Sequence, residues 1–198
     1  TGAIVMPCGI LPLNIFEPRY LNMVRDAMQS DQLIGMIQPK EKRLDTDHDL
    51  YDIGCAARIT QYAESTDGRL EIILTGLCRF KNKQELSTTR GYRLIMPDWS
   101  EYEVDYQPHQ EYSETSSSRL KSALKIYFQA NSFSTDWEIL NQLSTPELIN
   151  NLVGSLPFKS EDKQMLLEAT SQENRLDYLI ALLSSAGGDS KTRPKSLH

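Results

Sequence analysis

Cysteine and histidine are the side chains of this chain that could hold a transition metal or act as a nucleophile and its base. Each occurs three times, at wide spacing and without a Cys-x-x-Cys pair. Their positions are Cys8, Cys55, Cys78, His48, His109 and His198. Zinc sites and disulfide frameworks need closely spaced or evenly paired residues. We therefore predict no metal and no cofactor, and we expect reduced, buried cysteines in a cytoplasmic protein.

Other catalytic patterns are missing as well. Asp45, Asp47 and Asp49 alternate as in a calcium-binding loop, but the glycine and the distal glutamate of such a loop are absent. The sequence contains no phosphate-binding glycine loop, no nucleophile elbow and no His-Glu-x-x-His. We predict no catalytic residue and expect that the protein is not an enzyme. A hidden hydrolase stays open, because folding could place a strongly perturbed titratable group in a cleft.

Composition narrows the class of partner. The 198 residues include 21 basic and 27 acidic side chains, which give a net charge of −6. Proteins that bind nucleic acid through its phosphates usually carry the opposite charge, so RNA is disfavoured unless a local basic patch exists. No apolar run approaches the length of a membrane span. Hydrophobic residues make up 39% of the chain, enough for a packed core.

The first half of the chain has the pattern of strands and turns. Alternating apolar residues predict strands over 33–37, 51–62, 70–80 and 92–96. Asp67-Gly68 predicts a hairpin turn, and residues 18–28 have the spacing of one amphipathic helix. Pro7, Pro12 and Pro18 force a stiff, extended path that crosses a sheet or borders a groove open to strand addition.

The second half is predicted to be helical. Residues 100–115 are acidic and poor in apolar side chains, so we expect an exposed linker there. Thr145 and Pro146 predict a helix start with Thr145 as its cap. In the next helix, Met165 is expected on the buried face. The predicted division is a β-rich subdomain over 1–105, a helical bundle over 106–186 and a disordered tail over 187–198.

Three segments carry a family resemblance. Residues 7–20 read PCGILPLNIFEPRY, which resembles the FPG…LPLxIFEPRY signature of the Lon protease amino-terminal domain. Residues 49–57, DLYDIGCAA, and 76–80, GLCRF, resemble two further strands of that family. The resemblance extends from about Ile4 to Leu183.

The resemblance implies an α+β fold, with a PUA-like β pseudo-barrel followed by a small helical bundle. In full-length Lon, this domain precedes ATPase and peptidase modules and helps to recognise protein substrates. Neither module is present here, so the resemblance implies a stand-alone form and not a protease. The family has no agreed catalytic residues in this domain. Cys8 stands where the family often has glycine or another small residue.

These observations favour a non-enzymatic module that binds protein or extended peptide segments, alone or with a separate ATPase or protease. The alternative is a PUA-like domain that binds a small molecule or RNA. The candidate binding surface is a groove between the barrel and the helices, near Leu13, Phe16, Glu17, Arg19, Tyr20 and Arg79. An ordinary core or surface role is the competing interpretation for each of them.

Overall fold

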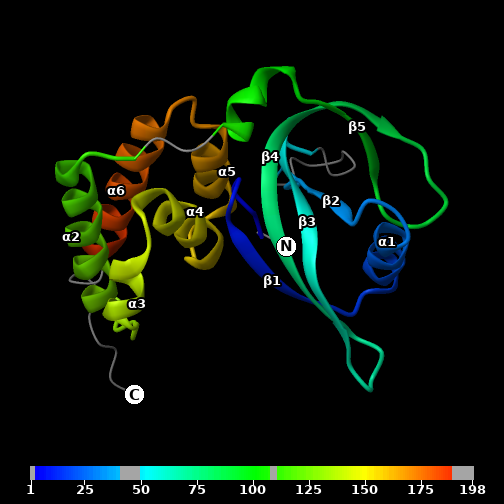
Figure 1. The fold of residues 1–198 in the computed structure, drawn as a ribbon, viewed down its shortest axis with the longest axis horizontal. Coiled ribbons are helices and arrows are strands. Elements are labelled where there is room, and N and C mark those ends of the chain that lie inside the picture. Colours follow the sequence, from blue (N-terminus) through cyan, green and yellow to red (C-terminus); the bar gives the residue numbers. More distant parts are fainter. Residues whose placement is uncertain (1–2, 41–49, 108–110, 189–198) are drawn as a thin grey trace, which may run out of the picture. The chain divides into compact units, whose positions relative to one another are not determined.

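The computed structural model describes residues 3–40, 50–107 and 111–188, and the chain forms two compact units (Figure 1). The first holds Thr1–His109 with Asn150–Leu167, and the second holds Gln110–Ile149 with Glu168–His198. This grouping differs from a division at residue 105. The later segment joins the first unit because Asn151 Oδ1 accepts a bond from the Ile10 N–H, and Gln164 donates to the Ile53 carbonyl.

Two sequence predictions fall on residues outside the described ranges. One is the aspartate-rich segment 45–49. The other is most of the expected tail, since the last helix reaches Gly188 and residues 189–198 are not described.

An antiparallel five-stranded sheet forms the first unit. Its strands are β1 (Ile10–Ile15), β2 (Leu33–Met36), β3 (Ile53–Glu64), β4 (Leu70–Leu86) and β5 (Leu94–Asp98). The order is β1-β4-β3-β2, and β5 pairs with the far end of β4. The fold is α+β, as predicted. The proline-rich path contains β1, and β5 continues through Pro97 instead of ending before it, because a proline is tolerated on an edge strand.

The turn between β3 and β4 follows the expected Asp-Gly chemistry. Gly68 has a φ of +82°, which glycine adopts without steric cost. The Ser65 N–H donates to the Arg69 carbonyl at 2.9 Å and so closes the loop. The long β3–β4 hairpin is visible as the cyan and green pair in Figure 1.

Phe80 fills the interior of the sheet. It is 1% exposed and packs with Ala56, Cys78, Ile37, Leu77 and Ile95. Two glycines make room for its ring. A Cβ added at Gly54 would lie 2.5 Å from Phe80 Cζ and 2.7 Å from the Met36 carbonyl oxygen, whereas one added at Gly35 would lie 3.3 Å from Cζ.

Helix α1 (Pro18–Met28) has the predicted bounds. Pro18 suits the first turn, where its missing N–H costs nothing. Val24 and Ala27 form the buried face. The helix therefore presents Arg19 and Tyr20 at its start, next to the end of β1.

The cysteines are placed less uniformly than expected. Cys55 and Cys78 are buried, but Cys8 is exposed. Cys8 has a φ of +58° in a tight turn that the Gly9 N–H closes on the Met6 carbonyl at 2.9 Å. This left-handed backbone suits glycine better than cysteine, and the turn holds the thiol outside the core.

The second unit is helical. It contains α2 (Glu114–Ala130), α3 (Trp137–Gln142), the first turn of α4 (Thr145–Ser155) and α6 (Gln172–Gly188). Helices α2 and α6 pack together. Their buried apolar residues include Leu120, Leu124, Leu176, Leu179 and Leu183.

Two details of the helical prediction were wrong. Ser144, not Thr145, caps α4: its N–H donates to the Glu147 carboxylate at 2.9 Å and its hydroxyl oxygen accepts from the Glu147 N–H at 3.5 Å, as in a capping box. The Thr145 hydroxyl instead pairs with that of Ser117. Met165 is 56% exposed on α5 (Ser160–Glu168), because its neighbours Leu166 and Leu167 occupy the buried face.

We predict that Gly54→Ala destabilises the protein by about 1–3 kcal/mol, because its methyl group overlaps the Phe80 ring and a main-chain oxygen that cannot both move away. Gly35→Ala, with its milder contact, should change stability much less. Urea unfolding of both variants measures the difference. Equal stability of the two would contradict the packing argument.

Candidate binding surface

Five of the six predicted surface residues lie together at the junction of β1 and α1. Leu13 is half-buried on β1, and Phe16 is 65% exposed immediately after that strand. Glu17 is the residue before α1, and Arg19 and Tyr20 lie in its first turn. The sequence motif therefore forms one local surface.

An ion pair orders the start of α1. Arg19 donates through Nε and Nη2 to Glu17 Oε2 at 3.0 and 2.8 Å, and its Cζ lies 4.6 Å from the centre of the Tyr20 ring. The hydrogen bond to Glu17, with a smaller effect of Tyr20, raises the pKa of Arg19. Because these polar groups bind one another, Phe16 is left as the exposed apolar group beside them.

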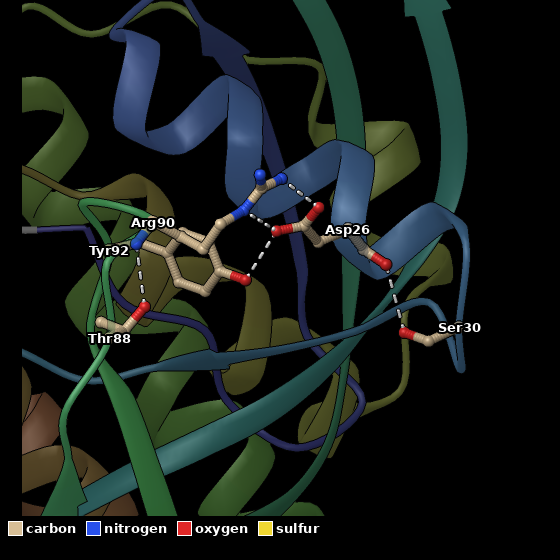
Figure 2. A network of polar contacts seen from close by, with 5 residues as sticks. All are labelled: Asp26, Ser30, Thr88, Arg90 and Tyr92. Atoms are coloured by element: carbon tan, nitrogen blue, oxygen red, sulfur yellow. Dashed lines mark hydrogen bonds and ion pairs between the residues drawn. The ribbon is translucent and has the colours of Figure 1, made fainter.

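The β4–β5 loop is fastened to the same helix, which the sequence analysis missed. Figure 2 shows Arg90 and Tyr92 pointing toward Asp26 of α1. Asp26 Oδ2 accepts from Arg90 Nε at 2.9 Å and from the Tyr92 hydroxyl at 2.8 Å. Between them, Gly91 lies so close that an added Cβ would be 3.4 Å from Arg19 Cβ. No local pattern signals a contact between residues 64 positions apart.

An open depression of about 480 Å³ lies on the outer face of the sheet, across β1, β4 and β3. Register places Pro12 beside Ile73, and Asn14 beside Glu71, on this face. The lining mixes apolar and polar side chains and also includes Leu13. A second depression of about 650 Å³, between α2 and α6, contains none of the predicted residues.

Arg79 does not belong to the surface. Its side chain is 6% exposed and pairs with Asp105, whose side chain is equally buried. The guanidinium donates to the two Asp105 oxygens at 2.9 and 2.7 Å and to the Leu167 carbonyl at 3.1 Å, and its face covers the Tyr102 ring. The motif that contains Arg79 is therefore a structural element of the first unit.

The same pair corrects the linker prediction. Residues Ser100–Tyr106 form a 3-10 helix, η1, instead of a fully solvated connection. Asp105 also accepts from the Arg79 main-chain N–H at 2.8 Å. The Cys78 thiol donates to the Tyr106 hydroxyl at 3.0 Å. An acidic run is normally solvated, but here one of its carboxylates neutralises a buried arginine.

The two buried cysteines, Cys55 and Cys78, are poorly suited to nucleophilic chemistry. Burial raises the pKa of the Cys55 thiol, and burial also raises that of Cys78, so both are thiols at neutral pH. Within residues 3–40, 50–107 and 111–188, no cluster of histidine, cysteine and acidic side chains could hold a metal ion. In the same ranges, no helix is long and apolar enough to cross a membrane.

Asp105→Ala should lower the free energy of unfolding by about 3–5 kcal/mol, because it leaves the Arg79 charge buried and unpaired. Glu101→Ala is the matched control: it removes the exposed partner of Lys81 from the same helix, and we expect little change. Denaturant unfolding measures both. Similar losses in the two variants would show that the Arg79 pair has no special weight.

Asp26→Asn should release the β4–β5 loop at neutral pH. Its hydrogen bonds with Arg90 and Tyr92 lower the pKa of Asp26 below 3.8, so the carboxylate stabilises the folded state above that pH and loses this effect as the pH falls through its folded pKa. Amide exchange of residues 87–93 should quicken in the variant, and in the unmodified protein only in acid. Asp31→Asn, an exposed aspartate beyond the end of α1, should exchange as the parent does; quickening in both variants would contradict the clamp.

Comparison with known proteins gives a consistent result. A family model, the ATP-dependent protease La (LON) substrate-binding domain, matches residues 1–185. The Lon protease of Haemophilus influenzae is 26% identical over 188 residues, which cover 92% of this chain and 23% of that protein. The Lon protease of Escherichia coli is 25% identical over 194 residues, with the same coverage. The chain thus spans about a quarter of the length of these relatives.

Solved structures share the fold. A Lon N-terminal domain protein from Xanthomonas campestris superposes with a TM-score of 0.58 at 20% identity, over 91% of this chain and 94% of that one. The N-terminal domain of a Mycobacterium avium complex Lon protease gives 0.59 at 19% identity, over 92% and 93%. The family model that matches the chain describes a substrate-binding domain and not a catalytic module.

Proposed function

Because the chain belongs to the family of Lon substrate-binding domains, we propose that it is a non-enzymatic module that binds exposed or extended segments of other proteins. The observation that carries this proposal is Phe16, which is 65% exposed in the segment that resembles the family signature. Aromatic side chains dominate the energetics of protein interfaces, and a contiguous exposed apolar patch marks an interaction site.

Neighbouring residues extend the apolar surface. Ile10, Pro12 and Asn14 alternate along one side of β1, Phe16 follows directly after the strand, and Ile73 lies beside Pro12. Ile10 is 52% exposed. Together with the outer-face depression, these residues offer a shallow apolar surface with polar groups around it, which suits an unfolded polypeptide better than a small molecule.

Charge argues against the RNA-binding alternative. The net charge is −6, and two cations near the β1–α1 junction, Arg19 and Arg90, are paired with Glu17 and Asp26. Phosphate recognition needs cations that are available to the backbone. Docking of the domain to a separate ATPase or protease is a further part of the proposal and rests on the family alone.

Phe16→Ala should weaken binding of an unfolded polypeptide by about fivefold or more, since a central aromatic contact is commonly worth over about 1 kcal/mol. Fluorescence anisotropy with labelled, reduced and carboxymethylated lactalbumin provides the measurement. Ile126→Ala, which removes an apolar group 59% exposed on α2, is the matched control and should bind as the parent does.

Three results would contradict the proposal. The parent protein could fail to bind the unfolded probe, it could bind disulfide-intact lactalbumin as tightly, or single-stranded RNA could displace the probe at equal concentration. The last result would favour the RNA-binding alternative.

A further inference from the structure

The free edges of the sheet differ in whether they can accept another strand. A strand that joins an edge needs outward main-chain N–H and C=O groups that alternate without interruption. The free edges lie along β1, β2, β5 and the end of β3 that extends beyond its pairing with β2. Each can be assessed from its pairing register.

The β1 edge is blocked. The Gly76 N–H donates to the Gly9 carbonyl, so Gly9 directs its main-chain groups toward β4. Because this direction alternates along a strand, the main-chain N–H and C=O groups point away from β4 at Ile10, Pro12 and Asn14. The Ile10 N–H is already used by Asn151 Oδ1 at 3.0 Å. Pro12 has no N–H. The strand addition that the proline-rich segment suggested is therefore disfavoured at β1 itself.

The β5 edge is blocked in the same way. The Asn82 N–H donates to the Asp52 carbonyl, so the main-chain groups of Asn82 face β3 and not β5. Pro97, which lies opposite Asn82 on β5, therefore directs its own main chain away from β4, toward the free edge. A proline at that place again removes the donor. The projecting end of β3 is interrupted by a bulge between Ile59 and Gln61, which twists the strand and breaks the alternation.

The β2 edge is blocked by neither a proline nor a bulge. The Ile59 N–H donates to the Gln32 carbonyl at 2.8 Å, so Ile34 and Met36 pair with β3, while Leu33 and Gly35 direct their N–H and C=O groups outward. Both residues are exposed. Among the described residues, no partner occupies either outward N–H.

We propose that a short, extended peptide binds by pairing with β2 as an added strand. This inference rests on the proposed function and assigns it a second contact, made through the main chain. The occupant is a peptide and not a second copy of this chain: four residues of edge bury far less than the roughly 1,200 Å² of a stable protein interface. Gly35 has no side chain, so a bulky residue of the peptide fits opposite it.

A matched pair of variants tests the protein side. Gly35→Pro removes the outward N–H and blocks the edge, whereas Gly35→Ala adds the same Cβ beside Phe80 but keeps the N–H. Ile34 precedes this position in extended backbone, which a following proline accepts. Gly35→Pro should bind unfolded lactalbumin at least about fivefold more weakly than Gly35→Ala, with both variants folded by circular dichroism.

A pair of peptides tests the ligand side with the unmodified protein, so that no variant needs to fold. The probes are fluorescein-labelled octapeptides of alternating tyrosine and threonine, N-methylated at either every tyrosine or every threonine. The bulky tyrosine fills the space opposite Gly35, so its own main chain faces β2 in an antiparallel added strand. N-methylation of the tyrosines should therefore abolish binding, whereas the peptide N-methylated at threonine should bind like its unmethylated parent.

The outcomes separate this inference from the proposed function. If the protein binds no unfolded polypeptide, both are overturned. If it binds the polypeptide but the two methylated peptides behave alike, or Gly35→Pro binds as Gly35→Ala does, strand addition at β2 is overturned and the binding function stands.

Discussion

A guanidinium enclosed by protein must be neutralised where it lies, because an unpaired buried charge costs more than most contacts return. Arg79 meets this need with the Asp105 carboxylate and the Leu167 carbonyl. One side chain of β4 is thereby joined to an acidic segment 26 residues later and to a helix 88 residues later. Together with the bonds of Asn151 and Gln164, this arrangement joins distant parts of the sequence into the first unit.

The alternation of inward and outward residues explains why the middle of β4 differs from its hairpin end. In the stretch of Cys78, Arg79 and Phe80, inward residues fill the sheet interior while Arg79 points from the other face to η1 and α5, so both faces are covered. Near the hairpin, Leu70, Ile72 and Leu74 are buried, but Ile73 lies in the open depression on the other face. The part of the sheet near the β3–β4 hairpin, which lacks the Arg79 arrangement, keeps an accessible outer face.

Patterns among neighbouring residues were enough to predict most of the strands and helices. The period-two strands, the Asp67-Gly68 turn and the Pro18 helix start are decided by neighbouring residues. Most of their observed bounds lie close to the predictions, although β4 continues six residues beyond the predicted end, to Leu86. The errors have a common physical origin. Arg79, Asp105 and Asp26 owe their positions to partners far along the chain, so a charge that looks solvated in sequence can be buried or clamped. The cluster around Phe16 was predictable because its residues are consecutive.

The two proposed contacts demand different things of a partner. The apolar side of β1 favours binding of hydrophobic side chains, most of which are buried in a folded protein and exposed in an unfolded one. The β2 edge favours binding of an accessible main chain, which any sequence provides once it is extended and not already paired. A folded protein meets these conditions only at a few places on its surface, whereas an unfolded segment meets both along its length with few constraints on its sequence. Selectivity for the state of a polypeptide, with tolerance of its sequence, follows from combining a shallow apolar surface with a short, unblocked strand edge.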